Sequence, residues 1–183
     1  MADSNITKKA LASALKELME ETSFRKISVG DICERCEMNR KSFYYHFEDK
    51  YDLVNWIFDT EVSSLLRDRR PDDQWEIITK VCSYLYGNRS FYCKAFQIQG
   101  QNSLLDHFRE FLLPLLQGRL AEMIGPGDIH QIGADFIADG IVCAIRRWLI
   151  DKNCVSPEEF VSIIRKMVEG TARSVYRELS AEE

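Results

Sequence analysis

Apolar residues recur every three or four positions along almost the whole chain, which is the spacing of one face of an α-helix. No convincing run of alternating apolar and polar residues indicates a β-strand, and no internal repeat is found. The sequence therefore predicts an all-α fold. We expect about nine helices, with approximate bounds at residues 7–21, 29–37, 40–47, 50–65, 75–87, 90–97, 104–124, 129–151 and 157–179.

Polar residues mark the starts of the first three helices. Thr7 is the expected N-cap of the first, Ser28 with Asp31 three residues later is a capping arrangement for the second, and Asn39 is the expected cap of the third. Only about three residues separate the second and third helices, which is the spacing of a helix-turn-helix. We therefore divide the chain into a three-helix DNA-binding domain, residues 1–50, and a C-terminal regulatory and dimerisation domain, residues 51–183.

The third predicted helix has two chemically different sides. At 100° per residue, Phe43 and Phe47 share one face and should point into the domain, whereas Lys41 and Tyr45 should point outward. The span 39–47 contains no carboxylate. A short helix that exposes cations and phenols suits the major groove of DNA, although a short basic segment taken alone is more often a solvated surface.

The outward residues of this helix divide into two roles. Arg and Lys near a helix start can donate to guanine O6 and N7, whereas hydroxyl groups and Lys hold phosphates. We therefore assign Arg40, Lys41 and Tyr45 to bases. The groups expected to hold the DNA backbone are Ser42, Tyr44, His46 and Lys50, together with the amides of the helix starts at Thr7 and Ser28.

The distribution of charge agrees with a local DNA-binding surface. The net charge is −5, which argues against a whole-surface polyanion binder. Residues 1–50 hold nine basic and nine acidic side chains, so the whole excess of negative charge, 15 basic against 20 acidic residues, lies in residues 51–183. Phosphate repulsion from the C-terminal part would help to orient the N-terminal part toward DNA.

Residues 27–32 and 39–47, followed by Lys50 and Leu53, resemble the helix-turn-helix signature of the TetR family of transcription regulators residue by residue. The resemblance covers roughly the first 60 residues. It implies a homodimer on a palindromic operator, with phosphate contacts at Ser42, Tyr44, His46 and Lys50 and base contacts at Arg40, Lys41 and Tyr45. Many members of the family have Gly or Ala where this chain has Lys41, so we expect that cation to alter the preferred operator.

The last two predicted helices favour self-association. The segment 129–151 interrupts its apolar positions with small residues that let a partner helix approach closely, and the segment 157–179 has a broad apolar stripe. Ordinary intramolecular packing must use part of each stripe. The resemblance implies that these two helices pair with their symmetry mates in a four-helix bundle, and a two-fold axis also suits two half-sites about one DNA turn or more apart.

Aromatic residues concentrate in the middle of the chain. They indicate either a packed core, which is the commoner outcome, or an effector pocket with polar handles, for which the candidates are Tyr92, Phe96, His107 and Trp148. The segments 88–92 and 94–96 also resemble, more distantly, a subgroup of the family that includes an activator of dihydroxyacetone kinase operons, in which a separate co-regulator protein senses the metabolite. The signal is thus a small-molecule effector or a protein, and both repressor and activator stay open.

The remaining chemistry excludes several classes of function. Cys33 and Cys36 have a redox-motif spacing, but we interpret them as core thiols, and no histidine pattern completes a metal site. No cofactor and no enzyme activity are expected; a helical enzyme in the C-terminal part is the alternative, testable at Asp106 and His107. Without a long apolar run or a secretory signal, the chain is expected to be cytoplasmic.

Overall fold

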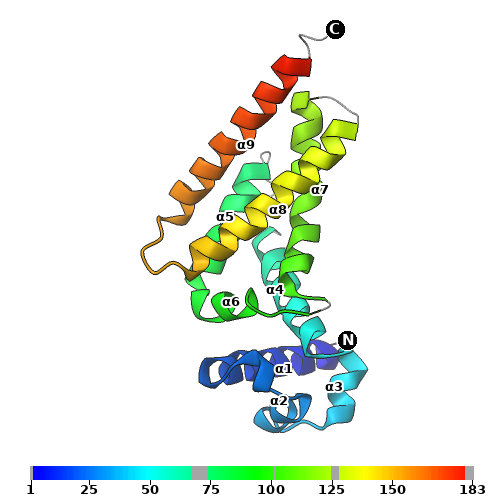
Figure 1. Cartoon of the computed structure of the whole chain (residues 1–183). Helices are drawn as coiled ribbons and strands as arrows, with labels where there is room; N and C mark the ends of the chain where they lie inside the picture. Colours follow the sequence, from blue (N-terminus) through cyan, green and yellow to red (C-terminus); the bar gives the residue numbers. More distant parts are fainter. Residues whose placement is uncertain (1, 67–73, 101, 125–127, 180–183) are drawn as a thin grey trace. The chain divides into compact units, whose positions relative to one another are not determined.

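The computed structural model describes residues 2–66, 74–100, 102–124 and 128–179, and these form helices and short connections without a strand (Figure 1). The predicted all-α fold is thereby confirmed. The helices are α1 (Ala2–Glu21), a 3₁₀ turn η1 (Phe24–Lys26), α2 (Val29–Arg35), α3 (Arg40–His46), α4 (Lys50–Leu66), α5 (Gln74–Gly87), α6 (Arg89–Ala95), α7 (Leu104–Ile124), α8 (Asp128–Ile150) and α9 (Pro157–Leu179).

The predicted start of α1 is wrong. The helix begins at Ala2, so Thr7 lies inside it and is not an N-cap. No proline or glycine stands between Ala2 and Thr7 to stop the helix from extending toward the N-terminus. The other α-helices begin within one residue of their predicted starts.

The turn between α2 and α3 starts earlier than predicted. The helix α2 ends at Arg35, and Glu37 takes a positive φ of 55°, a conformation that an α-helix cannot contain. The 3₁₀ turn η1 was not predicted, because three residues are too few to show a periodicity. Among the described residues, no helix is both long enough and apolar enough to span a membrane.

The chain folds into two compact units. The first unit contains Met1–Ser64 and Asn88–Leu104, and the second contains Leu65–Gly87 and Leu105–Glu183. The first unit therefore holds α1, α2, α3, most of α4 and, from later in the sequence, α6. Residue 50, the predicted domain boundary, is the first residue of α4 and lies inside the first unit.

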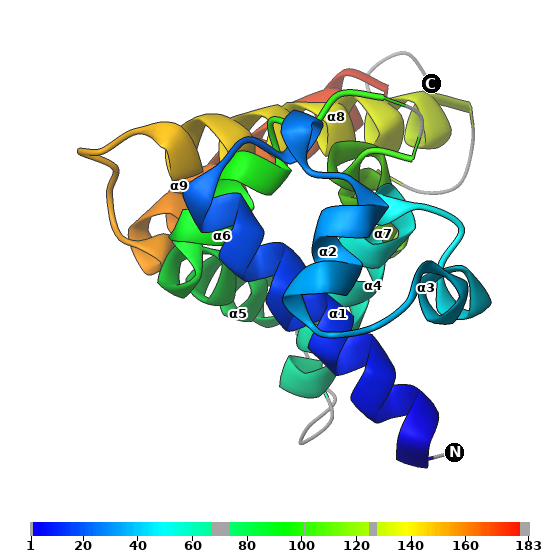
Figure 2. The ribbon, with the colours of Figure 1, turned by 90° about the horizontal axis from the view of Figure 1, so that it is seen from below.

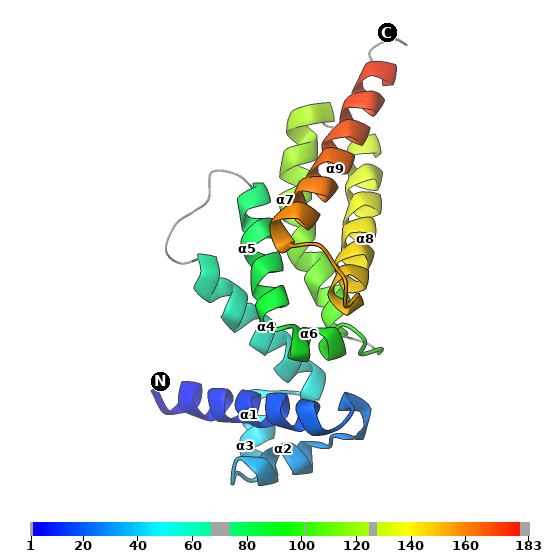
Figure 3. The same ribbon diagram turned by 90° about the vertical axis from the view of Figure 1, so that its left-hand side faces the viewer.

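The core of the first unit joins α1 to the helix-turn-helix. In Figures 2 and 3, α1 lies across α2 and α3, and it contacts both of them as well as α6. Burial of apolar surface at this junction is the main stabilising contribution. The fully buried side chains there include Leu11, Leu15, Ile32, Phe43 and Leu53.

The second unit is built on α5, α7, α8 and α9, and its most extensive helix contact is that of α5 with α9. Trp148 on α8 is 5% exposed and stacks on Phe160 of α9, with ring centroids 4.6 Å apart, and on Tyr86 of α5 at 5.5 Å. The Trp148 indole N–H donates to the carbonyl of Val155 at 2.8 Å. This side chain is therefore satisfied within the core, as buried Trp usually is.

Candidate nucleic-acid interface

A capping box fixes the start of α2, as predicted. The Ser28 hydroxyl accepts from the Asp31 amide at 3.2 Å, and the Asp31 carboxylate accepts from the Ser28 amide at 2.7 Å and from its hydroxyl at 2.8 Å. These hydrogen bonds from Ser28 are the main reason that the pKa of Asp31 is lowered. The Ser28 hydroxyl is thus used inside the protein, whereas its helix start faces solvent.

The start of α3 is capped by Asn39, also as predicted. Its side-chain oxygen accepts from the amide of Ser42 at 2.8 Å and from the Ser42 hydroxyl at 3.2 Å. Without this cap a seven-residue helix would leave several of its amides unpaired. The Ser42 hydroxyl nevertheless retains its lone pairs and lies at the start of the helix.

The inward and outward sides of α3 are those that the sequence predicts. Phe43 is fully buried and Phe47 is 3% exposed, whereas Tyr45 is 82% and Tyr44 59% exposed. Within α3 itself only Phe43 is buried, so the other sides of this short helix are open to solvent. Arg40 and Lys41 are exposed beside them, so the three predicted base-reading residues lie on one short helix.

Arg40 has a contact that the sequence analysis missed. A Cβ atom added at Gly30 of α2 would lie 2.5 Å from Nη2 of Arg40, so the guanidinium rests against the backbone of α2. A glycine in the first turn of a helix, where it costs up to about 1 kcal/mol relative to alanine, was the available signal. In this position Arg40 also lies near Asp31 and contributes, after Ser28, to the lowered pKa of that carboxyl group.

His46 and Lys8 border this face. His46 is half-buried, and its ring meets that of Tyr45 edge-on at 4.8 Å. Lys8 of α1, which the sequence analysis did not select, places its ammonium 5.5 Å from the ring centroid of Phe47 and 5.7 Å from that of Trp56. Thr7, whose predicted cap is absent, is half-buried one residue before Lys8.

Lys50 is the predicted phosphate-binding residue whose surroundings differ most from expectation. Its ammonium donates to the backbone carbonyls of Phe24 at 2.8 Å and Ile27 at 2.6 Å. The same ammonium lies 4.4 Å from the centroid of the Phe24 ring. Partial burial lowers the pKa of Lys50, and the charges of Asp31 and Asp49 oppose that shift.

The four predicted effector residues are divided between the two units. Tyr92 and Phe96 lie on and just after α6 in the first unit, where both are buried with ring centroids 6.2 Å apart, and the Tyr92 hydroxyl donates to Glu61. His107 on α7 and Trp148 on α8 belong to the second unit. Because all but His107 are buried among core side chains, their aromatic rings contribute to packing in this structure.

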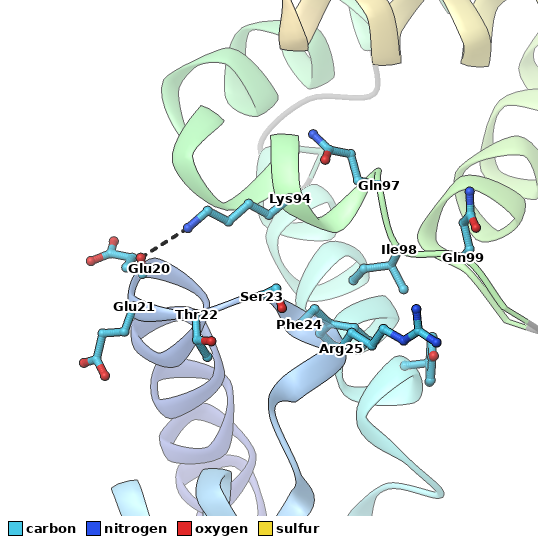
Figure 4. A pocket seen from close by; sticks show the side chains of 11 residues that line it. Glu20, Glu21, Thr22, Ser23, Phe24, Arg25, Lys94, Gln97, Ile98 and Gln99 are labelled. Atoms are coloured by element: carbon cyan, nitrogen blue, oxygen red, sulfur yellow. Dashed lines mark hydrogen bonds between the residues drawn. The ribbon is translucent and has the colours of Figure 1, made fainter.

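A pocket of about 830 Å³ lies within the first unit (Figure 4). It is formed by the end of α1, by η1, by Tyr51 of α4 and by the end of α6. The Lys94 ammonium, at its edge, donates to the carbonyls of Met19 and Glu20, where α1 ends. None of the four predicted effector residues lines it; its lining residues are Glu20, Glu21, Thr22, Ser23, Phe24, Arg25, Tyr51, Lys94, Gln97, Ile98 and Gln99.

Cys33 and Cys36, the two cysteines with the redox-motif spacing, are free thiols at the end of α2 in the first unit. Cys33 is 2% exposed, and burial raises the pKa of both Cys33 and Cys36. A raised pKa disfavours the thiolate, which is the form that binds metals and exchanges disulfides. In the part of the chain that the structure describes, no cluster of three or more His, Cys, Asp or Glu side chains is arranged to hold a metal ion.

Both the N-terminal and the C-terminal part of the sequence match known protein families. Residues 11–57 match the family described as bacterial regulatory proteins, tetR family. Residues 73–170 match a family described as a transcriptional regulator C-terminal region. The two matches together span the helix-turn-helix and most of the second unit.

Individual relatives agree with these matches. The HTH-type dhaKLM operon transcriptional activator DhaS of Lactococcus lactis subsp. lactis (strain IL1403) is 34% identical over 156 residues, which cover 80% of this chain and 81% of DhaS. A solved structure of a dihydroxyacetone kinase operon activator DhaS is 26% identical, with a TM-score of 0.62 over 92% of this chain and 97% of that one. A TetR transcriptional regulator from Streptococcus agalactiae 2603V is 23% identical and shares the fold, with a TM-score of 0.72 over 92% of this chain and 96% of its own.

Proposed function

Because this chain belongs to the TetR family of transcriptional regulators, we propose that it binds a palindromic operator as a homodimer through α2 and α3. Members of this family are DNA-binding regulators and not enzymes, which removes the alternative of a helical enzyme in the C-terminal part. The proposal adds the mode of binding, the oligomeric state and the residues that contact DNA.

The observation that carries the proposal is the outward side of α3. Two tyrosines, an arginine and a lysine are exposed there, and no carboxylate stands between Asn39 and Phe47 to repel phosphate. Arg40, Lys41 and Tyr45 are the proposed base contacts. Phosphate contacts are proposed for the side chains of Ser42, Tyr44, His46 and Lys50, and for the backbone at the N-cap Ser28. Because Thr7 lies inside α1, the helix-start amides expected there are not part of this proposal.

An exposed apolar surface on α8 and α9 supports the dimer. On α8, Ile132 is 71% and Phe136 75% exposed, although Ala134 and Ala138, on the opposite side of the same helix, are completely buried. Met167 on α9 is 67% exposed. A helix with one apolar face packed inside and a second one in water is typical of a subunit whose second face meets a partner. We therefore propose that α8 and α9 pair across a two-fold axis.

The regulatory signal is proposed to act through residues beyond 50. The candidate residues are Tyr92, Phe96, His107 and Trp148, and the signal is either a small-molecule effector or a co-regulator protein. The name of the Lactococcus relative describes an operon activator, so activation is proposed here alongside repression.

The test is selection of genomic fragments with the purified chain, across a range of salt concentrations. The expected product is an inverted repeat, and its affinity should fall steeply as salt rises because Lys and Arg displace counterions from phosphate. A variant with Arg40, Lys41 and Tyr45 all changed to Ala is the matched control, since these side chains are exposed and their loss should leave the fold intact. Failure to enrich any inverted repeat at every salt concentration would refute the proposal.

A further inference from the structure

The pocket in Figure 4 lies within the first unit, and contacts between its walls hold them in place. Lys94 of α6 donates to the carbonyls of Met19 and Glu20, which joins α6 to the end of α1. Tyr51 of α4 packs edge-on against the Phe24 ring, with centroids 5.1 Å apart, and so joins α4 to η1. The hollow between these elements is therefore a feature of one folded unit.

The segment that follows α6 is attached to α4. Gly100 has a φ of 144°, which residues other than glycine rarely adopt, and a Cβ atom there would lie 3.4 Å from the Tyr51 ring. Two residues later, the backbone carbonyl of Asn102 accepts from the Asn55 side chain of α4 at 3.1 Å. Residues 97–99, which form one wall of the pocket, thus lie between two attached points of the chain.

The lining combines buried apolar side chains with exposed polar ones. Phe24 and Ile98 are each 7% exposed, and Tyr51 is half-buried beside Phe24. The volume of about 830 Å³ and this mixture of an apolar lining with a few polar groups are typical of small-molecule sites. The exposed lining residues with uncharged or cationic polar groups are Ser23, Arg25, Lys94, Gln97 and Gln99.

The charge that this lining leaves open is positive. Arg25 is exposed and makes no side-chain hydrogen bond or ion pair with the described residues. Glu21, by contrast, accepts two N–H groups of Arg35 at 2.8 Å, and Figure 4 shows the carboxylates of Glu20 and Glu21 turned away from Arg25. A free guanidinium beside an apolar surface suits a carboxylate or a phosphate, which it can bind through two parallel hydrogen bonds.

We propose that this pocket binds a small organic anion, a carboxylate or a phosphate ester on a short apolar body. Its charged group pairs with Arg25, and its apolar part packs against Tyr51 and Ile98. Ser28, the N-cap of α2, follows η1 after one residue, so the ligand lies against the turn that leads into α2. The inference goes beyond the proposed function, because occupation of the pocket can be measured without DNA.

The test measures binding of four aromatic compounds of similar size to the full chain by NMR titration. Benzoate and phenyl phosphate are the anions, benzamide is the uncharged analogue of benzoate, and benzylamine is the cation. Both anions should shift the resonances of residues 20–25 and 94–99 with a dissociation constant of about 1 mM, because so small a ligand buries little surface. Benzamide and benzylamine should bind at least about tenfold more weakly, because neither pairs with a guanidinium.

Arg25→Gln removes the proposed charge partner. Since the side chain is exposed and makes no contact that holds the fold, the variant should fold like the wild type and bind both anions at least about tenfold more weakly. Lys26→Gln is the matched control, because it removes the same charge from the next residue of η1, which is exposed but does not line the pocket. It should bind both anions like the wild type.

Ser23→Phe fills the pocket without changing its charge. Ser23 is exposed and its hydroxyl caps no helix, so a larger side chain can be placed there, and it should abolish the shifts of residues 94–99 by both anions. Three results would overturn the inference. They are an absence of shifts in residues 20–25 and 94–99 with both anions up to about 10 mM, equal affinity for benzoate and benzamide, and equal anion binding by Arg25→Gln and Lys26→Gln.

Discussion

The Arg40 side chain lies against Gly30, and this contact bears on how Arg40 would read a base. Its guanidinium lies where a side chain at Gly30 would stand, close to the carboxyl group of Asp31. The residue is exposed, and a long flexible side chain can turn from α2 into a groove at little cost. Because Gly30 has no side chain, the Arg40 guanidinium can lie against α2, next to the helix α3 that is proposed to contact DNA bases.

Replacing Arg40 by Ala is expected to change which bases are preferred at one symmetric pair of operator positions. A lost bidentate contact to guanine should remove about 1 to 3 kcal/mol of discrimination there. The measurement is a selection of randomised operators with the wild type and with Arg40→Ala at one salt concentration. Identical base preferences in the two selections would show that Arg40 does not read sequence.

At the scale of single residues, some features of the structure could be predicted from the sequence and others could not. The inward positions of Phe43 and Phe47, and the caps at Ser28 and Asn39, depend on spacings of a few residues, which a sequence displays directly. The partners of Lys50 stand 23 and 26 residues earlier in the chain. No local pattern predicts which of two polar targets, a carbonyl or a phosphate, a flexible four-carbon side chain will reach.

At the scale of the element, α6 is attached to α1 and α4 by charged side chains. Lys94 donates to the carbonyls of Met19 and Glu20, in the last turn of α1, where the carbonyls have no partners within the helix. Glu61 of α4 pairs with Lys16 of α1 and accepts from the hydroxyl of Tyr92 on α6. Sequence periodicity predicted α6 itself, but it gave no indication that α6 belongs with the N-terminal helices.

Lys94→Met is expected to loosen the end of α1. The variant removes a cation from the negative end of a helix dipole together with two hydrogen bonds to carbonyls, and the side chain is exposed, so a loss of about 1 kcal/mol in the free energy of unfolding is expected. Hydrogen exchange should accelerate in the last turn of α1 and in α6.

Lys80→Met is the control for that variant. Lys80 makes an ion pair with Glu76 one turn earlier on α5, at 2.7 Å, and such surface pairs contribute about 0.3 to 0.5 kcal/mol. Its loss should leave exchange in α1 and α6 unchanged. Equal protection of α1 in Lys94→Met and in Lys80→Met would mean that Lys94 does not hold the helix end.

At the scale of the whole molecule, the proposed dimer makes the apolar surface of α8 and α9 a determinant of DNA binding. Each subunit carries one reading helix, and joining two subunits makes the second half-site contact effectively intramolecular. Affinity for a palindrome should then depend on residues other than those proposed to contact DNA. If the exposed apolar surface of α8 and α9 does not form a dimer interface, changes to its residues should leave operator affinity unaltered.

Phe136→Glu is expected to convert the dimer to a monomer. The side chain is 75% exposed, so the fold of the single chain should survive, whereas a carboxylate buried at an apolar interface is strongly unfavourable. Sedimentation should show a fall from twice the mass of 21.3 kDa to that mass, together with loss of tight operator binding.

Val155→Glu is the matched control, because Val155 is 37% exposed but lies in the connection between α8 and α9. It should sediment and bind like the wild type. A Phe136→Glu variant that remained dimeric would place the interface elsewhere.

The first unit can be completed only late in synthesis, because its second segment follows part of the second unit in the sequence. Its last segment ends at Leu104, 40 residues after Ser64, and the chain between them includes α5 of the second unit. At about 5 to 20 residues per second, the ribosome needs roughly 2 to 8 s to add those residues. During that interval the nascent α1 has no Lys94 at its last carbonyls and Glu61 has no Tyr92. The helices proposed to bind DNA therefore emerge first, but the first unit acquires its full set of contacts only after α5 and α6 have left the ribosome.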